Sequence, residues 1–185
     1  MNPAFLYLPG STLTMAELTA ARIDGDVFEI GEGYIPADLV EARSTRASSV
    51  ACLIPVDTAA SGPTAAWIHG AGDSPPAIHH VRRAVERRIR SNRQARVVLH
   101  DTSVPSTELE VLGGVLVMTP TRTMVDLALG VHRDESLVRW LVLLAETDET
   151  LLDAAIDHID GLARVPGTRA ARAALVRTRG RIRRR

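Results

Sequence analysis

The chain contains no lysine, so all 22 of its Lys and Arg residues are arginines. This absence excludes catalysis through a lysine Schiff base. It also excludes the phosphate-binding loop that ends in Gly-Lys-Ser/Thr and nuclease motifs that close on a lysine. A GC-rich coding sequence favours arginine codons, so the bias is not by itself a sign of selection for recognition.

Cysteine, aromatic residues and long apolar runs are also scarce. Cys52 is the single cysteine, which excludes an internal disulfide, a CxxC redox site and a multi-cysteine zinc site. The longest apolar run, residues 140–145, is far shorter than the roughly 20 residues that cross a bilayer. We therefore expect a cytoplasmic chain without a membrane span or signal peptide. With 45% apolar residues, it should fold as one domain or two small ones.

The formal net charge is zero, but the charges are segregated along the chain. Residues 1–81 carry three arginines and nine acids, and residues 82–96 carry seven arginines and one acid. Residues 97–163 carry three arginines and twelve acids, whereas residues 164–185 carry nine arginines and no acid. Either the two basic blocks bind a polyanion, or the last acidic and basic blocks pair within the fold or are simply solvated.

Arginines bind phosphate bidentately, so the basic blocks predict a nucleic-acid interface. They contain no aromatic residues for stacking on bases, which favours duplex DNA. The interpretation requires that both blocks gather into one outward-facing surface. About six arginines on phosphates would give a log–log salt slope on the order of −5. The candidate DNA-binding residues are Arg82, Arg83, Arg87, Arg88, Arg90, Arg93, Arg169, Arg172, Arg177, Arg179 and Arg181.

The first third of the chain reads as helix, hairpin and helix. Thr14 and Glu17 form a capping box that predicts a helix to about residue 22. Alternating apolar residues around two glycines predict a hairpin over 27–36, and residues 37–53 regain helical character. The stretch 57–63, DTAASGP, is predicted to be a linker.

The remaining residues combine strands and helices. A small helix is predicted over 63–70, strands over 95–102, 107–112 and 115–118, and a helix that Thr119 caps. The segment around residues 77–94 is ambiguous, and its periodicity favours a helix. Helices follow after residues 134, 149 and 167; the first of them should be the most buried, and the second carries an acidic stripe. The fold class is α+β, with an antiparallel sheet and a C-terminal helical bundle.

Candidate catalytic groups are scattered rather than set at a familiar spacing. A metal-dependent nuclease built around His100, Asp101 and Glu108 is a weak alternative, since such groups on strands are usually solvated. The same applies to the neighbouring candidates His79, His80 and Glu110. His69 is predicted to cap a helix C-terminus beside Gly70. We expect no cofactor, no metal site and no enzymatic activity.

The decapeptide TPTRTMVDLA at 119–128 resembles the T-x-x-RT-x-x-DLA signature of proteins related to AbiEi, the antitoxin of type IV toxin–antitoxin systems. The segments TAAWIHGAG (64–72), PPAIHHVRR (75–83) and LEVLGGVLVMTP (109–120) are similar to flanking segments of that family. The resemblance covers about residues 47–180. It implies a strand at 77–83 and a repressor of its own operon that counteracts a nucleotidyltransferase-like toxin.

The resemblance extends to an N-terminal winged helix, because LTMAEL and GEGYIPAD look like its helix start and wing. One short helix precedes the wing here, so the part expected to enter the major groove is missing or reduced. This divides the chain into a reduced winged-helix region, 1–56, and an AbiEi-like C-terminal domain, 57–185.

The signature also has a structural interpretation. Arg122 and Asp126 lie one helical turn apart and are predicted to pair, and Thr119 caps the same helix.

The leading hypothesis is an antitoxin-like transcriptional regulator that binds duplex DNA through its arginine-rich segments. The alternative is a protein-interaction module without operator binding.

Overall fold

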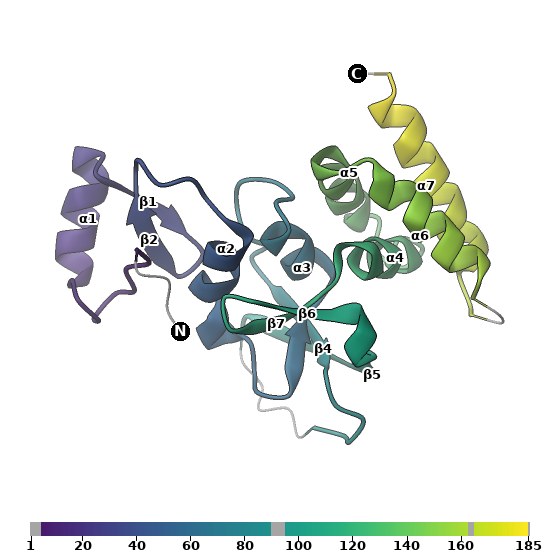
Figure 1. The fold of residues 1–185 in the computed structure, drawn as a ribbon, viewed down its shortest axis with the longest axis horizontal. Helices are drawn as coiled ribbons and strands as arrows, with labels where there is room; N and C mark the ends of the chain where they lie inside the picture. The colour runs from purple at the N-terminus through teal and green to yellow at the C-terminus, as the bar shows by residue number, and fades with distance from the viewer. Residues whose placement is uncertain (1–4, 90–94, 163–164, 185) are drawn as a thin grey trace.

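A computed structural model describes residues 5–89, 95–162 and 165–184. Three parts follow one another across the molecule (Figure 1). A helix and a two-stranded hairpin lie at one end, a five-stranded sheet lies in the middle, and helices α4–α7 form the other end.

The N-terminal part is held by one helix packed on one hairpin. Helix α1 (Met15–Asp24) begins with the predicted capping box, in which Glu17 accepts from the backbone N–H of Thr14, and Gly25 ends it in the left-handed conformation. The hairpin is also confirmed, with β1 (Val27–Ile30) antiparallel to β2 (Gly33–Pro36). Leu18 is the fully buried residue of α1, and it packs against the hairpin. The resulting core is small.

Two expectations for the next stretch are wrong. The helix predicted over 37–53 is confined to α2 (Arg43–Ser49) and a 3-10 turn, η1 (Ala51–Leu53), and no side chain caps α2; residues 37–42 are turn and irregular backbone. The predicted linker 57–63 contains β3 (Thr58–Ala60), which is completely buried. Its small residues are typical of a loop in sequence, but here they belong to the central strand of the sheet.

The sheet has the order β5-β4-β3-β7-β6 and is mixed. Its other strands are β4 (His79–Arg83), β5 (Val97–Ser103), β6 (Leu109–Leu112) and β7 (Val115–Met118). The β3–β4 and β6–β7 pairs are antiparallel, whereas β3–β7 and β4–β5 are parallel. The strand that the resemblance implies at 77–83 is confirmed, and the helix that the periodicity favours there is wrong. Burial alternates with a period of two from His79 to Val81, as in a strand.

The α+β class and the C-terminal helical bundle are confirmed. Thr119 caps α4 (Pro120–Gly130) by accepting from the backbone N–H of Arg122. Helices α5 (Leu137–Thr147), α6 (Thr150–Asp160) and α7 (Thr168–Ile182) follow. The most buried helix is α3 (Gly62–Ile68) rather than α5, because α3 lies against both the sheet and α4.

The described residues form two large hydrophobic cores. One fills the bundle of α4–α7, and the other surrounds Trp67 and includes Leu6, Ile30 and Ile35 from the N-terminal part. Trp140 of α5 packs against both cores. No helix within the described ranges is long and apolar enough to cross a membrane.

Candidate functional site

The arginines of the first basic block are held by carboxylates. Arg82 pairs with Asp126 at 2.5 Å, and both side chains are largely buried. Arg83 contacts Asp101 at 3.0 Å and also donates to the Asp101 backbone carbonyl. The two more exposed residues also have partners: Arg87 pairs with Asp57, and Arg88 lies 3.8 Å from Asp101. Arg90 and Arg93 lie outside the described residues.

The arginines of α7 divide into two groups. Arg172 pairs with Asp160 at 3.1 Å, and Arg179 pairs with Asp153, so both bind the acidic stripe predicted on α6. Exposed arginines without an ion pair in the described ranges form the second group: Arg169, Arg177, Arg181, Arg183 and Arg184. Arg183 and Arg184, which follow the last helical residue, were not among the predicted contact residues.

Helical geometry explains this division. At 100° per residue, Arg172 and Arg179 fall on the side of α7 that faces α6. Arg177 and Arg181 lie one turn apart on the opposite side, and Arg184 follows the last helical residue, Ile182; we call these three residues the arginine stripe. The α6 carboxylates therefore neutralise one side of the helix and leave the other positively charged.

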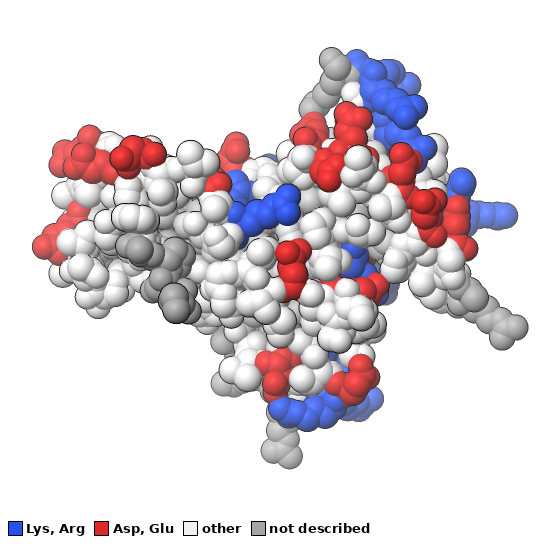
Figure 2. Space-filling model, viewed as in Figure 1, with Lys and Arg blue, Asp and Glu red and all other residues white. Residues whose placement is uncertain are grey.

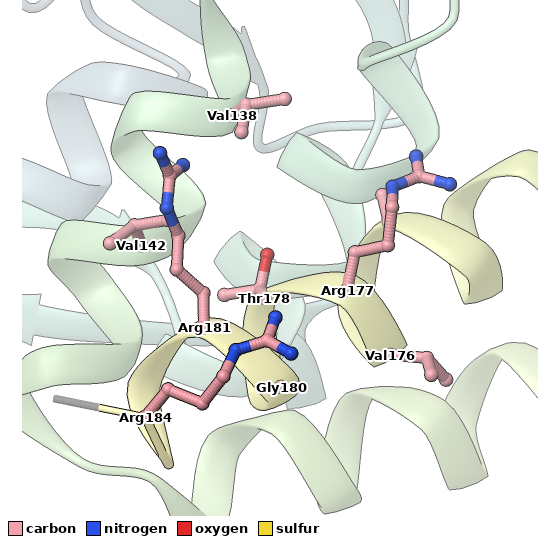
Figure 3. A pocket seen from close by; sticks show the side chains of 9 residues that line it. Val138, Val142, Val176, Arg177, Thr178, Gly180, Arg181 and Arg184 are labelled. Atoms are coloured by element: carbon pink, nitrogen blue, oxygen red, sulfur yellow. The ribbon is translucent and has the colours of Figure 1, made fainter.

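The arginine stripe borders a groove of about 420 Å³ between α5 and α7. Val138 and Val142 of α5 line its apolar side (Figure 3). Arg181 extends toward these valines, Arg184 lies over Gly180, and Arg177 stands apart from both. The groove thus combines guanidinium groups with a half-buried apolar wall.

The two basic blocks do not form one surface, so that expectation is wrong. The strand that carries Arg82 and Arg83 lies in the central sheet, whereas α7 is at the far end of the molecule (Figure 1). In Figure 2, basic atoms at the lower edge are bordered by acidic ones, and a separate basic area covers α7. A ligand that binds to the arginine stripe therefore need not contact the first basic block, residues 82–96.

Within the signature, Arg122 and Asp126 do not pair with each other as predicted. Arg122 pairs with Glu108, and Asp126 pairs with Arg82 of β4. Both side chains are more than four-fifths buried. They fasten α4 to β4 and to the 3-10 turn (Ser106–Glu108) that precedes β6, which the spacing along one helix could not show.

Among the groups proposed for a nuclease, His80 and His100 come together, whereas the carboxylates contact other partners. Asp101 contacts Arg83, Glu108 contacts Arg122, and Glu110 lies 4.0 Å from His69. His79 is completely buried on the opposite face of β4 from His80. In the part of the chain that the structure describes, no group of three or more His, Cys, Asp or Glu side chains could hold a metal ion.

Two histidine interactions are specific. The Nε2 of His69 lies 2.7 Å from the Met118 carbonyl, so the ring joins the end of α3 to β7 instead of capping its own helix. The Nδ1 of His80 lies 2.9 Å from the Nε2 of His100. Burial lowers the pKa of all three rings, and the Arg82 charge further lowers the pKa of His100.

Comparison with known proteins identifies the family. A search of curated proteins finds no match. The family model of the AbiEi antitoxin C-terminal domain matches residues 50–176, which covers more than half of the chain and includes the signature helix and most of α7. The chain therefore belongs to the AbiEi antitoxin family.

Proposed function

We propose that the chain is a cytoplasmic transcriptional regulator of a type IV toxin–antitoxin system that contacts duplex DNA through α7. Family membership gives it an antitoxin role, in a family that is not an enzyme family. The proposal adds the DNA contact and a nucleotidyltransferase-like toxin as the functional partner.

The arginine stripe carries the proposal. Arg177, Arg181 and Arg184 are exposed and have no ion pair in the described ranges; the first two lie about 6 Å apart along α7, and Arg184 follows its last residue. Duplex DNA carries about one charge per 1.7 Å of its axis, so several phosphates lie within reach of this length. Guanidinium groups that are not already paired can bind them without first breaking an internal contact.

A second candidate, a protein-interaction module without operator binding, is favoured by the apolar wall of the same groove. Val138 and Val142 offer nothing to phosphates but would pack against a protein. Arg82 and Arg83 are held by internal carboxylates, which reduces the positive surface available to DNA.

Fluorescence anisotropy with the duplex upstream of the chain's own gene separates the two candidates. We expect the double variant Arg177→Ala/Arg181→Ala to weaken binding and to reduce the log–log salt slope by about 1.8. The matched control, Arg172→Ala/Arg179→Ala, removes the same charge from the side of α7 that faces α6 and should change the slope by less. Equal effects of both variants, or no binding below about 1 μM at about 50 mM salt, would reject the DNA contact.

A further inference from the structure

Charge is distributed unevenly between the two ends of the molecule. Around α1 and its hairpin, the exposed acids without an arginine partner in the described ranges are Glu17, Asp24, Asp26 and Asp38. Around α7, the exposed arginines without an ion pair in those ranges are Arg169, Arg177, Arg181, Arg183 and Arg184. Figure 2 shows acidic atoms over the N-terminal end and a basic area over α7. Because the formal net charge is zero, two copies repel each other little as a whole, and their opposite ends attract.

The groove between α5 and α7 has the charge and the apolar surface to bind an acidic, partly apolar segment. Its volume is about 420 Å³, and its described lining residues include three arginines and no acid. Val138 and Val142 are half-buried on its apolar side, and Arg181 extends toward them (Figure 3). A suitable occupant therefore places an aliphatic side chain on the valines and a carboxylate beside it.

The exposed side of α1 carries this combination at its C-terminal turn. Leu18 points into the small N-terminal core, and at 100° per residue Ile23 lies about 140° around the helix from it. Ile23 is 77% exposed, so most of its side chain is free to contact another molecule. Asp24 is the next residue, and Asp26 follows the C-cap Gly25, so two carboxylates lie close to the isoleucine in sequence. The C-terminal end of the helix dipole adds further negative charge here.

The two surfaces lie at opposite ends of one copy. Helix α1 belongs to the N-terminal part, and α7 belongs to the bundle at the other end, with the sheet between them (Figure 1). A chain therefore cannot fill its own groove, whereas a second copy can. Arg22, the arginine of α1, lies about 100° around the helix from Ile23 and already contacts Glu29 at 3.6 Å. Its charge is thus directed away from the surface that would enter the groove.

We propose that the groove between α5 and α7 binds the C-terminal turn of α1 from a second copy of this chain. Ile23 of the second copy packs on Val138 and Val142, and its Asp24 and Asp26 carboxylates contact the arginine stripe. The two surfaces differ, so a pair of copies still has one free α1 and one free groove. Association therefore continues beyond the dimer as the concentration rises. The proposal does not depend on DNA binding, although DNA would contact the same arginines.

Sedimentation equilibrium of the full chain without DNA, over about 5–500 μM protein at about 50 mM salt, tests the association. The interface is small, so we expect a dissociation constant on the order of 100 μM and a weight-average mass that rises with concentration. Raising the salt to about 500 mM should weaken the association at least about 3-fold, because exposed charges are then screened. A monomer at every concentration, or association that salt does not weaken, would overturn the proposal.

Two variants and their mixture identify the surfaces. Ile23→Ser/Asp24→Ser alters the α1 side, Arg181→Glu alters the groove, and each variant alone should associate at least about 10-fold more weakly. In an equal mixture, the intact groove of the first variant can bind the intact α1 of the second. The mixture should therefore form dimers but nothing larger. Unchanged association of either variant alone, or a mixture that stays monomeric, would refute the proposal.

Matched controls make similar changes elsewhere on the surface. Val40 is 87% exposed and lies outside α1, and Arg169 is an exposed arginine of α7 that does not line the groove. Val40→Ser and Arg169→Glu should keep the association within about 2-fold, since exposed charges away from the contact are screened. An equal loss in these controls would contradict the assigned surfaces. The concentration and salt series on the unmodified chain remains decisive if a variant loses its circular dichroism signal.

Discussion

Arg46 should contribute more to stability than any surface arginine. It is 8% exposed, and its Nη1 donates to the carbonyls of Trp67 at 2.7 Å and Gly72 at 2.8 Å. Its Nε and Nη2 donate to the Glu41 carboxylate at 2.6 and 3.0 Å, and its guanidinium lies 5.2 Å from the centre of the Trp67 ring. One side chain thus joins α2 to the α3 region.

Arg46→Met keeps much of the apolar stem but removes the guanidinium. Hydrogen bonds from a charged donor contribute about 1.5–3 kcal/mol each, and the carbonyls of Trp67 and Gly72 would lose theirs. Loss of a partner from a buried ion pair costs about 3–5 kcal/mol. We expect the free energy of unfolding to fall by about 4 kcal/mol. For a chain of this length, that corresponds to a decrease in Tm of roughly 12 °C.

Equilibrium unfolding in guanidinium chloride, followed by tryptophan fluorescence and circular dichroism, measures this loss. The control is Arg43→Met, which replaces an exposed arginine of the same helix and should change the free energy of unfolding by less than about 0.5 kcal/mol. A decrease below about 1 kcal/mol for Arg46→Met would refute the reasoning, because Arg46 would then not hold α2 against α3.

Three further predictions concern the ion pairs, the turns and the histidines. Asp126→Asn should lower the free energy of unfolding by about 2–4 kcal/mol in denaturant titrations, since it leaves Arg82 buried without its counterion. Gly113→Ala should be destabilising by about 2–4 kcal/mol in thermal melts, because φ is +54° and a Cβ would lie 2.2 Å from the Ser44 carbonyl oxygen. Acidification should lower stability: burial reduces the pKa of four histidines, so their contribution is complete above the unfolded value of about 6.5 and is lost as the pH falls below it. Each such histidine adds a slope of up to about 1.4 kcal/mol per pH unit, measured by unfolding at about pH 7.5 and about pH 5.5.

Matched controls sharpen these measurements. Asp153→Asn removes a carboxylate from an ion pair in which that carboxylate is 67% exposed, and we expect little change in stability. Gly25→Ala carries the same kind of positive φ but has no atom within 4 Å of the new Cβ, so its difference from Gly113→Ala isolates the steric contribution. Greater stability at acidic than at neutral pH would contradict the histidine prediction.

Local signals made much of the fold predictable. The capping box at Thr14, the hairpin over 27–36 and the Thr119–Pro120 helix start each depend on neighbouring residues, and all are confirmed. The strand β3 was missed because its small residues are typical of a loop and only its place at the centre of the sheet explains them.

The candidate site was only partly predictable for the same reason. The composition shows that α7 is basic, but which arginines are neutralised depends on the rotation of α7 against α6. The partners of Arg122 and Asp126 come from other segments of the chain, so their spacing of four suggested the wrong pair. DNA binding and the boundary at residue 56 stay predictions.

The position of Trp140 between the two large cores gives the molecule a built-in optical probe. Trp67 is completely buried in one core, whereas Trp140 packs against both. The chain has no other tryptophan. Replacing Trp67 by phenylalanine would leave Trp140 as the single tryptophan. Its fluorescence would report on the contact between the two cores. Its emission would reveal whether the bundle separates from the sheet before either one melts.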